Sequence, residues 1–444
     1  MQEEDGPVSE RSQTETLPVL VLAGGTVLDA TGQRRADVLV RDGRVVEVAP
    51  TIDPPAGATV LDAGGALVGP GFVDLHAHLR EPGGEEAETV ETGARAGALG
   101  GYTALVAMPN TFPPIDSVEM VRAVRHLARG ACTEVAVAAT ITEGRRGERL
   151  APLAELAAAG VRIVTDDGAG VADAQLARRA FEYAAPFGLV VAEHCEDPAL
   201  AAGGVAHEGE WSSLLGLAGI PAEAEEVMLA RDLALAGRSG ARFHALHVST
   251  AGSLALLREA RRRGVAVTAE VTPHHLALTD AAIAGFDPVY RVNPPLRPEA
   301  DRRALVAAVA AGEVDAVATD HAPHARHAKE APFAEAPPGM IGLETAFGVA
   351  RGALAELPLD VLWGLLSWKP AAIAGLDARH GGPVAPGRPA NLCVVDPEAR
   401  WRVDPAAGAS RSANTPYAGW ELVGRARHTV LAGGVVVRDG EAQR

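Results

Sequence analysis

The chain has 444 residues, of which 48% are hydrophobic and 22% charged, so it can fold as one large globular domain plus a smaller one. Its formal net charge of −17 argues against nucleic acid or an anionic membrane surface as a partner. No run of about 18 apolar residues is present, which argues against a membrane-spanning helix.

The first segment, residues 1–17, is polar and acidic and is predicted to be a disordered tail. It lacks the basic start and apolar core of a signal peptide. The three cysteines, Cys132, Cys195 and Cys393, form no CxxC pair. We therefore expect a cytoplasmic location.

Both ends of the chain read as short strands separated by turns. Within residues 18–68, Asp42-Gly43 lies between alternating apolar residues and predicts a hairpin. Residues 376–444 have the same character, and "LAGGTV" at 22–27 is echoed by "LAGGVV" at 431–436. The pattern predicts one small β-sandwich domain built from 18–68 plus 376–444.

The middle of the chain, residues 69–375, alternates strands with helical patterns, which is typical of a parallel sheet. Eight such β/α units predict a TIM (β/α)8 barrel. An open doubly wound sheet is the alternative, but it would need a glycine-rich loop after its first strand, where this chain has His-Ala-His. The candidate strands cover residues 71–79, 102–110, 134–142, 161–167, 188–195, 242–249, 265–272 and 314–321.

Polar residues gather at the ends of these strands, where barrel active sites are built. Imidazole and carboxylate groups together suit a divalent ion such as zinc. Six ligands exceed the four that one tetrahedral zinc takes, so two ions bridged by the strand-4 carboxylate are expected. The candidates are His76, His78, Asp166 or Asp167, His194, His247 and Asp320.

The remaining histidines are predicted to be less central. We expect surface positions for His126, His207, His380 and His428. His244 should face away from His247 on the same strand and play a structural part. His274, His275, His321 and His327 could each either support the centre or be structural.

Eight motifs resemble, in order, those of the amidohydrolase superfamily and, within it, the bacterial type I dihydroorotases. The resemblance covers nearly all of residues 18–440. It implies the barrel and the composite β domain already predicted. The motifs are "DLHAHLREPG", "MPNT", "DDG", "EHCED", "HVST", "RVNPPLR", "ATDHAPH" and "GMIGLET".

The resemblance also implies a role for each matching residue. His76, His78 and Asp320 match the first metal site, His194 and His247 the second, and Asp167 the bridge. Arg80, Asn110 and His324 match residues that hold the substrate carboxylate, and Asn293 matches a contact to the substrate ring. Residues 325–342 resemble a loop over the active site.

The implied reaction is reversible hydrolysis of L-dihydroorotate to N-carbamoyl-L-aspartate in pyrimidine biosynthesis, with one or, as we expect, two Zn²⁺ per subunit. Asp320 would be the general base and then the general acid. The resemblance leaves open a homodimer and a complex with aspartate transcarbamoylase.

Two rival functions follow from the same family. Hydantoinases and allantoinases bridge their metals with a carboxylated lysine after strand 4, yet the only lysines here are Lys329 and Lys369. A non-catalytic scaffold for aspartate transcarbamoylase is the other rival, and such relatives have lost metal ligands that this chain retains.

Overall fold

Eight parallel strands form a closed barrel in the computed structural model, which describes residues 18–443. Two arcs of hydrogen-bonded strands make up its wall, in the orders β10-β9-β8 and β11-β12-β15-β16-β17. Isolated parallel bridges join Ala139 to Val164 and Ala77 to His321, and these two bridges close the ring. The strands are β8 (Phe72–Ala77), β9 (Tyr102–Ala107), β10 (Glu134–Val137), β11 (Ile163–Val164), β12 (Val190–Glu193), β15 (Arg242–Ala245), β16 (Val267–Val271) and β17 (Ala316–Val317).

The predicted TIM barrel is therefore confirmed, and each observed strand lies inside its predicted range. The hydrogen-bonded ladders are shorter than predicted because the polar residues at the strand ends leave them. Beyond β8, for example, the His78 backbone N–H donates to the carbonyl of His321. These residues are thereby free to turn their side chains toward the barrel mouth.

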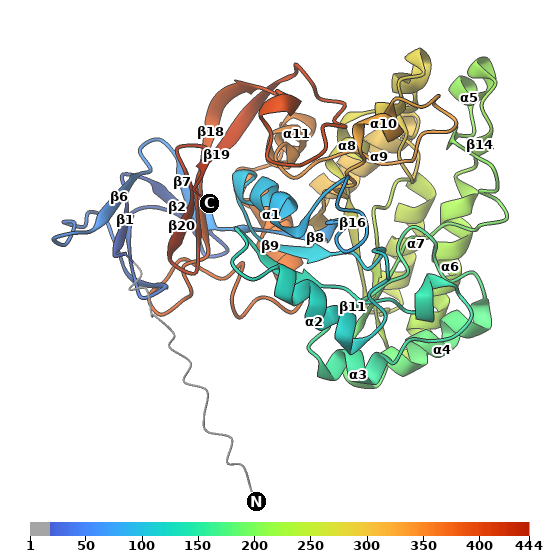
Figure 1. The fold of residues 1–444 in the computed structure, drawn as a ribbon, viewed down its shortest axis with the longest axis horizontal. Helices are drawn as coiled ribbons and strands as arrows, with labels where there is room; N and C mark the ends of the chain where they lie inside the picture. Colours follow the sequence, from blue (N-terminus) through green and yellow to red (C-terminus); the bar gives the residue numbers. More distant parts are fainter. Residues whose placement is uncertain (1–17, 444) are drawn as a thin grey trace, which may run out of the picture.

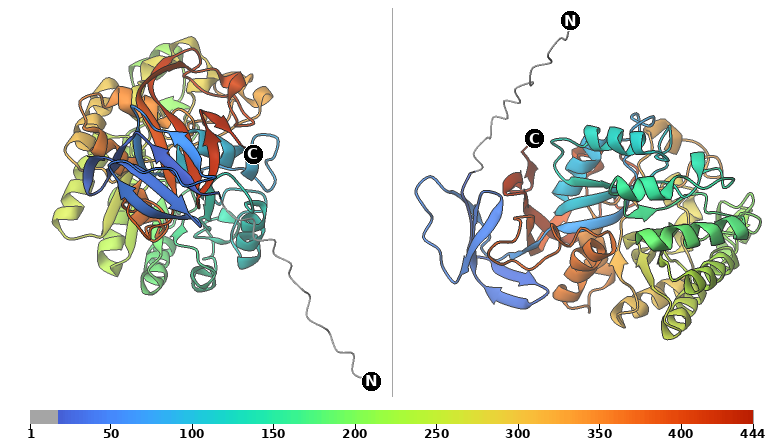
Figure 2. Two further views of the ribbon diagram at one scale, coloured as in Figure 1. Left: turned by 90° about the vertical axis from the view of Figure 1, so that its left-hand side faces the viewer. Right: turned by 90° about the horizontal axis from the view of Figure 1, so that it is seen from below.

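Helices surround the barrel, as Figures 1 and 2 show. Several begin at a side-chain cap: the hydroxyls of Thr89, Ser117 and Thr250 and the Asp173 carboxylate each accept from the backbone of the first turn. Their buried faces pack on the outside of the strands. The main helices are α1 (Val90–Leu99), α2 (Val118–Leu127), α3 (Leu153–Ala158), α4 (Ala174–Ala184), α6 (Glu223–Ser239), α7 (Ala251–Arg262), α9 (Glu299–Ala310), α11 (Ala346–Ala353) and α12 (Leu359–Leu366).

The inside of the barrel is filled by side chains rather than by solvent. Small and branched apolar residues such as Val73, Ala104 and Ala192 form this core. Helix α13 (Trp368–Ile373) packs against its lower end through Ala371 and Ile373. Because apolar side chains fill the interior and the lower end, polar chemistry is left to the opposite end of the barrel, where the parallel strands finish.

Strands from both ends of the chain form two further sheets beside the barrel (Figure 1). One has the order β5-β4-β1-β6 and the other β21-β20-β19-β18-β7-β2-β3. Their facing apolar residues share one core, which makes a β-sandwich. The strands are β1 (Leu20–Ala23), β2 (Thr26–Asp29), β3 (Gly32–Arg35), β4 (Asp37–Arg41), β5 (Arg44–Ala49), β6 (Thr59–Asp62), β7 (Leu67–Pro70), β18 (Leu392–Arg402), β19 (Glu421–Leu431), β20 (Gly434–Arg438) and β21 (Glu441–Ala442).

The hairpin predicted at Asp42-Gly43 is confirmed. Strands β4 and β5 pair antiparallel up to Arg41 and Arg44, and the two residues between them have φ values of 50° and 74°. Two positive φ values in a two-residue loop match the twist of the flanking strands. We keep 18–68 with 376–444 and 69–375 as the proposed domain limits. The tail predicted at 1–17 lies outside the described residues.

Among residues 18–443, no helix combines the length and the apolar character needed to cross a lipid bilayer.

Candidate active site

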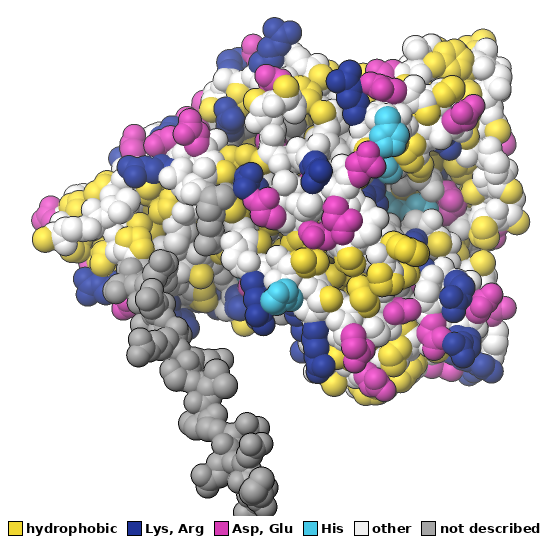
Figure 3. All heavy atoms as spheres, viewed as in Figure 1, with side chains coloured by type: hydrophobic (Ala, Val, Ile, Leu, Met, Phe, Trp, Pro, Cys, Tyr) yellow, Lys and Arg dark blue, Asp and Glu magenta, His cyan; other side chains and the backbone are white. Residues whose placement is uncertain are grey.

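The six predicted metal ligands come together, buried, at one end of the barrel. Figure 3 shows histidine side chains inside a hollow on the face drawn there. Each ligand lies at or just beyond the end of a strand, so the barrel itself brings them together from distant parts of the sequence. They are His76 and His78 on or after β8, Asp167 after β11, His194 after β12, His247 after β15 and Asp320 after β17.

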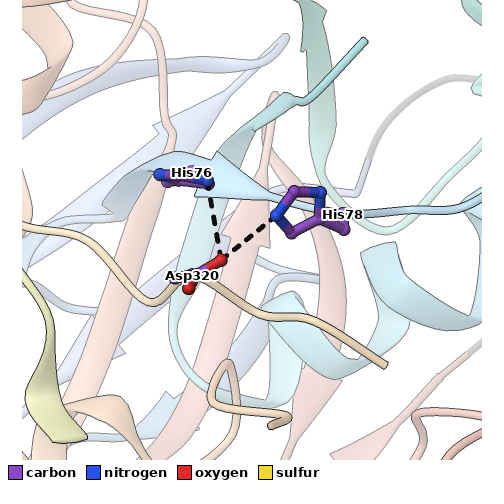
Figure 4. A group of neighbouring side chains, drawn as sticks. All are labelled: His76, His78 and Asp320. Atoms are coloured by element: carbon purple, nitrogen blue, oxygen red, sulfur yellow. Dashed lines mark hydrogen bonds and ion pairs between the residues drawn. The ribbon is translucent and has the colours of Figure 1, made fainter. Parts of the chain in front are cut away.

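One group of three consists of His76, His78 and Asp320, drawn in Figure 4. Oδ1 of Asp320 lies 3.1 Å from Nε2 of His78 and 3.5 Å from Nε2 of His76. Both imidazoles therefore turn the same ring nitrogen toward one carboxylate oxygen. This is the arrangement that the His-x-His spacing on a strand predicts.

A second group consists of His76, Asp167 and His247. Oδ1 of Asp167 is 3.4 Å from Nε2 of His76 and 3.6 Å from Nε2 of His247, and its Oδ2 is 3.4 Å from Nε2 of His78. The Asp167 carboxylate thus faces both groups. His194 joins the edge of the second group, with its Nδ1 2.8 Å from Nε2 of His247.

The donor set fits a divalent cation. Nε2 of His76 is buried and has no hydrogen-bond partner among the described residues, although two carboxylates lie beside it. A buried polar atom without a partner is costly unless something binds it. Burial alone would raise the pKa of Asp167, but nearby His76 and His247 outweigh it and hold that pKa well below its usual value. The carboxylate is therefore ionised at neutral pH and suited to a cation.

The neighbouring Asp166 faces away from this centre. Its Oδ1 accepts hydrogen bonds from the backbone N–H groups of Ile141 at 2.8 Å and Thr142 at 3.1 Å, and its Oδ2 accepts from the Thr142 hydroxyl. Asp166 therefore fastens the loop after β10 to the loop after β11. Of the two aspartates in "DDG", Asp167 alone reaches the histidines.

The four predicted substrate-binding residues line the same cleft as five of the six candidate ligands. They come from loops after β8, β9, β16 and β17, so no short segment of sequence contains the cleft. Burial lowers the pKa of Arg80 to about 10, which leaves its guanidinium positive at neutral pH in an otherwise acidic protein. The four are Arg80, Asn110, Asn293 and His324.

Each of these side chains already has a partner that fixes its direction. Nε of Arg80 donates to the Pro323 carbonyl at 3.1 Å, which leaves the terminal guanidinium nitrogens to face a ligand. Oδ1 of Asn110 lies 2.8 Å from Nδ1 of His78, and Nδ2 of Asn293 lies 3.3 Å from Nε2 of His194. His324 uses Nε2 to contact the carbonyl of Pro338 at 2.8 Å.

Sequence reasoning missed two groups behind the ligands. Glu270 on β16 contacts Nδ1 of His76 at 2.9 Å, and Arg145 donates through Nη2 to the backbone carbonyl of Asp167. Neither belongs to a pattern with ligand spacing. A glutamate in the middle of an apolar strand, "VAVTAEVT", was the one available signal for Glu270.

The prediction of surface positions was wrong for His380 and His428, which are buried, and His207 is half-buried. His380 is buried because it contacts Oε2 of Glu134 at 2.9 Å and Oγ1 of Thr103 at 3.0 Å. Partners so distant in sequence give no local signal. His126 and His327 are exposed, whereas His274, His275 and His321 are buried.

Comparison with known proteins identifies the family. A family model described as dihydro-orotase-like matches residues 65–253. Dihydroorotases from Pelotomaculum thermopropionicum and Streptomyces coelicolor are 45% and 48% identical to the chain, each over 428 residues, 95% of this chain and 99% of theirs. The dihydroorotase of Mycobacterium tuberculosis is 48% identical over 419 residues, 92% of this chain and 96% of its own.

Solved structures agree on the fold. The L-hydantoinase (dihydropyrimidinase) of Arthrobacter aurescens superposes with a TM-score of 0.85 at 24% identity, covering 96% of this chain and 98% of its own. The dihydropyrimidinase of Brevibacillus agri gives 0.83 at 24% identity over 96% of each chain. Such low identities carry the architecture but not the substrate. The near-full-length relatives decide the family: the chain belongs to the dihydroorotases and is a hydrolase.

Proposed function

We propose that the chain catalyses the reversible hydrolysis of L-dihydroorotate to N-carbamoyl-L-aspartate, a step of de novo pyrimidine biosynthesis. One observation carries this proposal: a single cleft joins the His/Asp centre to Arg80, Asn110 and His324. A centre suited to a cation supports hydrolysis, and an arginine beside it supports a substrate with a carboxylate. The substrate is an anion, so a local positive group is needed within a chain of net charge −17.

We propose zinc as the cation, with two ions per subunit. His76, His78 and Asp320 would hold one, His194 and His247 the other, and Asp167 would bridge them. A divalent cation bound there polarises a carbonyl oxygen and lowers the pKa of a bound water. The Asp167 carboxylate supports two ions rather than one, because its Oδ2 faces His78 of the first site and its Oδ1 faces His247 of the second.

Asp320 is the proposed proton carrier. Its carboxylate lines the cleft, and Oδ1 lies 3.1 Å from Nε2 of His78. In hydrolysis it accepts a proton from the attacking water and returns it to the ring nitrogen as the C–N bond breaks. Ring closure reverses these steps, with the proton leaving the nitrogen and returning to the departing water.

Arg80 and Asn110 are the proposed clamp for the substrate carboxylate. A guanidinium offers two parallel N–H donors to a carboxylate. Because Oδ1 of Asn110 accepts from Nδ1 of His78, its amide nitrogen is left to donate to the substrate. His324 would release the Pro338 carbonyl and bind the substrate carboxylate instead. Asn293 would contact the ring of the substrate.

Substrate comparison separates this proposal from the two rival functions. We expect turnover of dihydroorotate, loss of activity on chelation and recovery on adding zinc. Hydantoin and allantoin should be hydrolysed far more slowly, and Asp320→Ala should abolish turnover while leaving the fold intact. A faster reaction with hydantoin or allantoin would favour another cyclic amidase, and the absence of all turnover with bound zinc would favour a non-catalytic scaffold.

Three further properties stay predictions. They are the cytoplasmic location, the homodimer and the complex with aspartate transcarbamoylase. Size measurement of the purified chain, alone and mixed with aspartate transcarbamoylase, tests the last two.

A further inference from the structure

Strand β16 contributes none of the predicted metal or substrate residues, yet it places a fully buried carboxylate, Glu270, behind the candidate metal centre. An isolated buried carboxylate is strongly unfavourable unless it is hydrogen-bonded on all sides. The groups that Glu270 contacts therefore indicate its role.

The first contact fixes the ring of His76. Oε1 of Glu270 lies 2.9 Å from Nδ1 of His76. A carboxylate accepts only, so Nδ1 carries the proton and Nε2 presents its lone pair. That Nε2 is the buried atom without a hydrogen-bond partner, and it lies 3.4 Å from Asp167 and 3.5 Å from Asp320. Glu270 thus selects the tautomer that can bind a cation.

The second contact reaches the other side of the centre. The backbone N–H of His247 donates to the same Oε1 at 3.3 Å. His247 adopts a φ of 30°, which is strained for a residue with a side chain. One carboxylate oxygen therefore restrains a ligand of β8 and the unusual backbone of a ligand that follows β15.

The third contact holds the carboxylate itself. Oε2 of Glu270 lies 3.0 Å from Nε2 of His244, and Nδ1 of His244 lies 2.8 Å from Oγ1 of Thr268. All of these groups lie within the barrel wall, away from the cleft lining. The chain from Thr268 through His244 to Glu270 ends at His76.

We infer that Glu270, held by His244, is a positioning residue that orients His76 and His247 for cation binding. This inference rests on the proposed function, because it presumes the cation centre. Hydrogen bonds from carboxylates to metal-binding imidazoles fix the ring and raise its basicity, and their removal typically costs about 10- to 100-fold in metal affinity.

Zinc affinity tests the inference without reference to turnover. Parent protein, Glu270→Gln, His244→Ala and Thr268→Val are stripped of metal and titrated with zinc against a chromogenic chelator. We expect Glu270→Gln to bind zinc about 10- to 100-fold more weakly, His244→Ala to show a smaller loss, and Thr268→Val, one contact further from the centre, to show the smallest loss. The His244 variant keeps the test decisive if the Glu270 variant does not fold.

The melting temperature separates positioning from general stability. In chelator, Glu270→Gln should melt near the parent, whereas the rise in melting temperature on adding zinc should be smaller. Zinc affinities of Glu270→Gln and His244→Ala equal to that of the parent would overturn the inference. Failure of the parent itself to bind zinc would instead overturn the proposed metal centre.

Discussion

At the scale of single residues, the site is built from side chains that each use one end for support and the other for chemistry. Asn110 supports His78 through its oxygen, and Glu270 supports His76. The adjacent aspartates of "DDG" divide the same two tasks between them, since Asp166 holds a loop and Asp167 faces the histidines. Spacing alone could not separate two neighbours of identical chemistry.

Arg80→Ala should cost substrate recognition while keeping the metal. Truncating one partner of a buried charge pair costs roughly 2–5 kcal/mol, which corresponds to about 30-fold or more in kcat/KM. Arg80→Lys should recover part of this, because it restores the charge without the two-pronged donor. Steady-state kinetics on dihydroorotate, with zinc content measured in parallel, provide the check. Unchanged KM in Arg80→Ala would remove Arg80 from the clamp.

At the scale of elements, the segment 325–342 forms one wall of the cleft and is held by a lysine. Pro338 and Gly339 line the cleft, and the short helix α10 (Arg326–Lys329) begins the segment. Nζ of Lys329 donates to the carbonyls of Pro288, Arg291 and Pro337, at 3.0, 3.3 and 2.7 Å. These bonds tie the wall to the turn that precedes Asn293.

Lys329→Ala should therefore loosen the wall without touching the metal. Burial lowers the pKa of Lys329 to about 7, so each of its hydrogen bonds is expected to contribute about 0.5–1.5 kcal/mol, and part of this is recovered by water. We expect a severalfold rise in KM and faster proteolysis within 325–342. Arg326→Ala is the matched control, because that side chain on the same helix is 91% exposed and pairs only with Glu330 in the described structure. Equal behaviour of the two variants would contradict the role of Lys329.

Another contact that links two elements lies at the start of β10. Glu134 binds Arg379 and contacts His380 at 2.9 Å, which fastens the segment after α13 to the barrel. Burial alone would raise the pKa of Glu134, but the bonds from His380 and Arg379 outweigh it and lower that pKa to about 2. Folding therefore gains stability from Glu134 at any pH above its ordinary value near 4.5, and this gain is lost as the pH falls toward 2.

Glu134→Gln should lack this pH-dependent contribution to stability. At pH 7 we expect the free energy of unfolding of the variant to be about 1 kcal/mol lower than that of the parent. The difference is modest because a third of the Glu134 side chain is exposed. The difference should shrink at pH 3.5. Urea unfolding of both proteins in chelator, at both pH values, measures it. A difference that stays constant or grows toward acid would contradict the assignment.

The sequence predicted the strands and turns better than the side-chain contacts that connect them. All eight barrel strands and the Asp42-Gly43 hairpin follow from local periodicity and turn chemistry, and the six candidate ligands could be picked out because they lie at strand ends. Glu270, Arg145 and the burial of His380 were not predictable in this way. Each depends on a partner more than 20 residues distant, and only the closed barrel brings such partners together.

At the scale of the whole molecule, the two ends of the chain meet in one sheet. Strand β18 pairs antiparallel with β7, so the C-terminal strands complete a sheet that the N-terminal strands begin. The turn between β19 and β20 also rests on the hairpin at residues 42–43. Gly433 lies so near that hairpin that a Cβ atom at 433 would be 2.6 Å from Cα of Gly43.

Gly433→Ala should therefore destabilise the molecule by more than backbone strain alone. Gly433 has a φ of +80° and Gly57 a φ of +79°, but nothing lies within 4 Å of a Cβ atom at Gly57. Both alanines carry the left-handed penalty of about 1–2 kcal/mol, whereas only the one at 433 must also push two hairpins apart, at about 1–3 kcal/mol more. Melting temperatures of the two variants isolate this second cost, because the shared strain cancels. Equal melting temperatures would mean that the two ends of the chain meet too loosely for their contact to stabilise the fold.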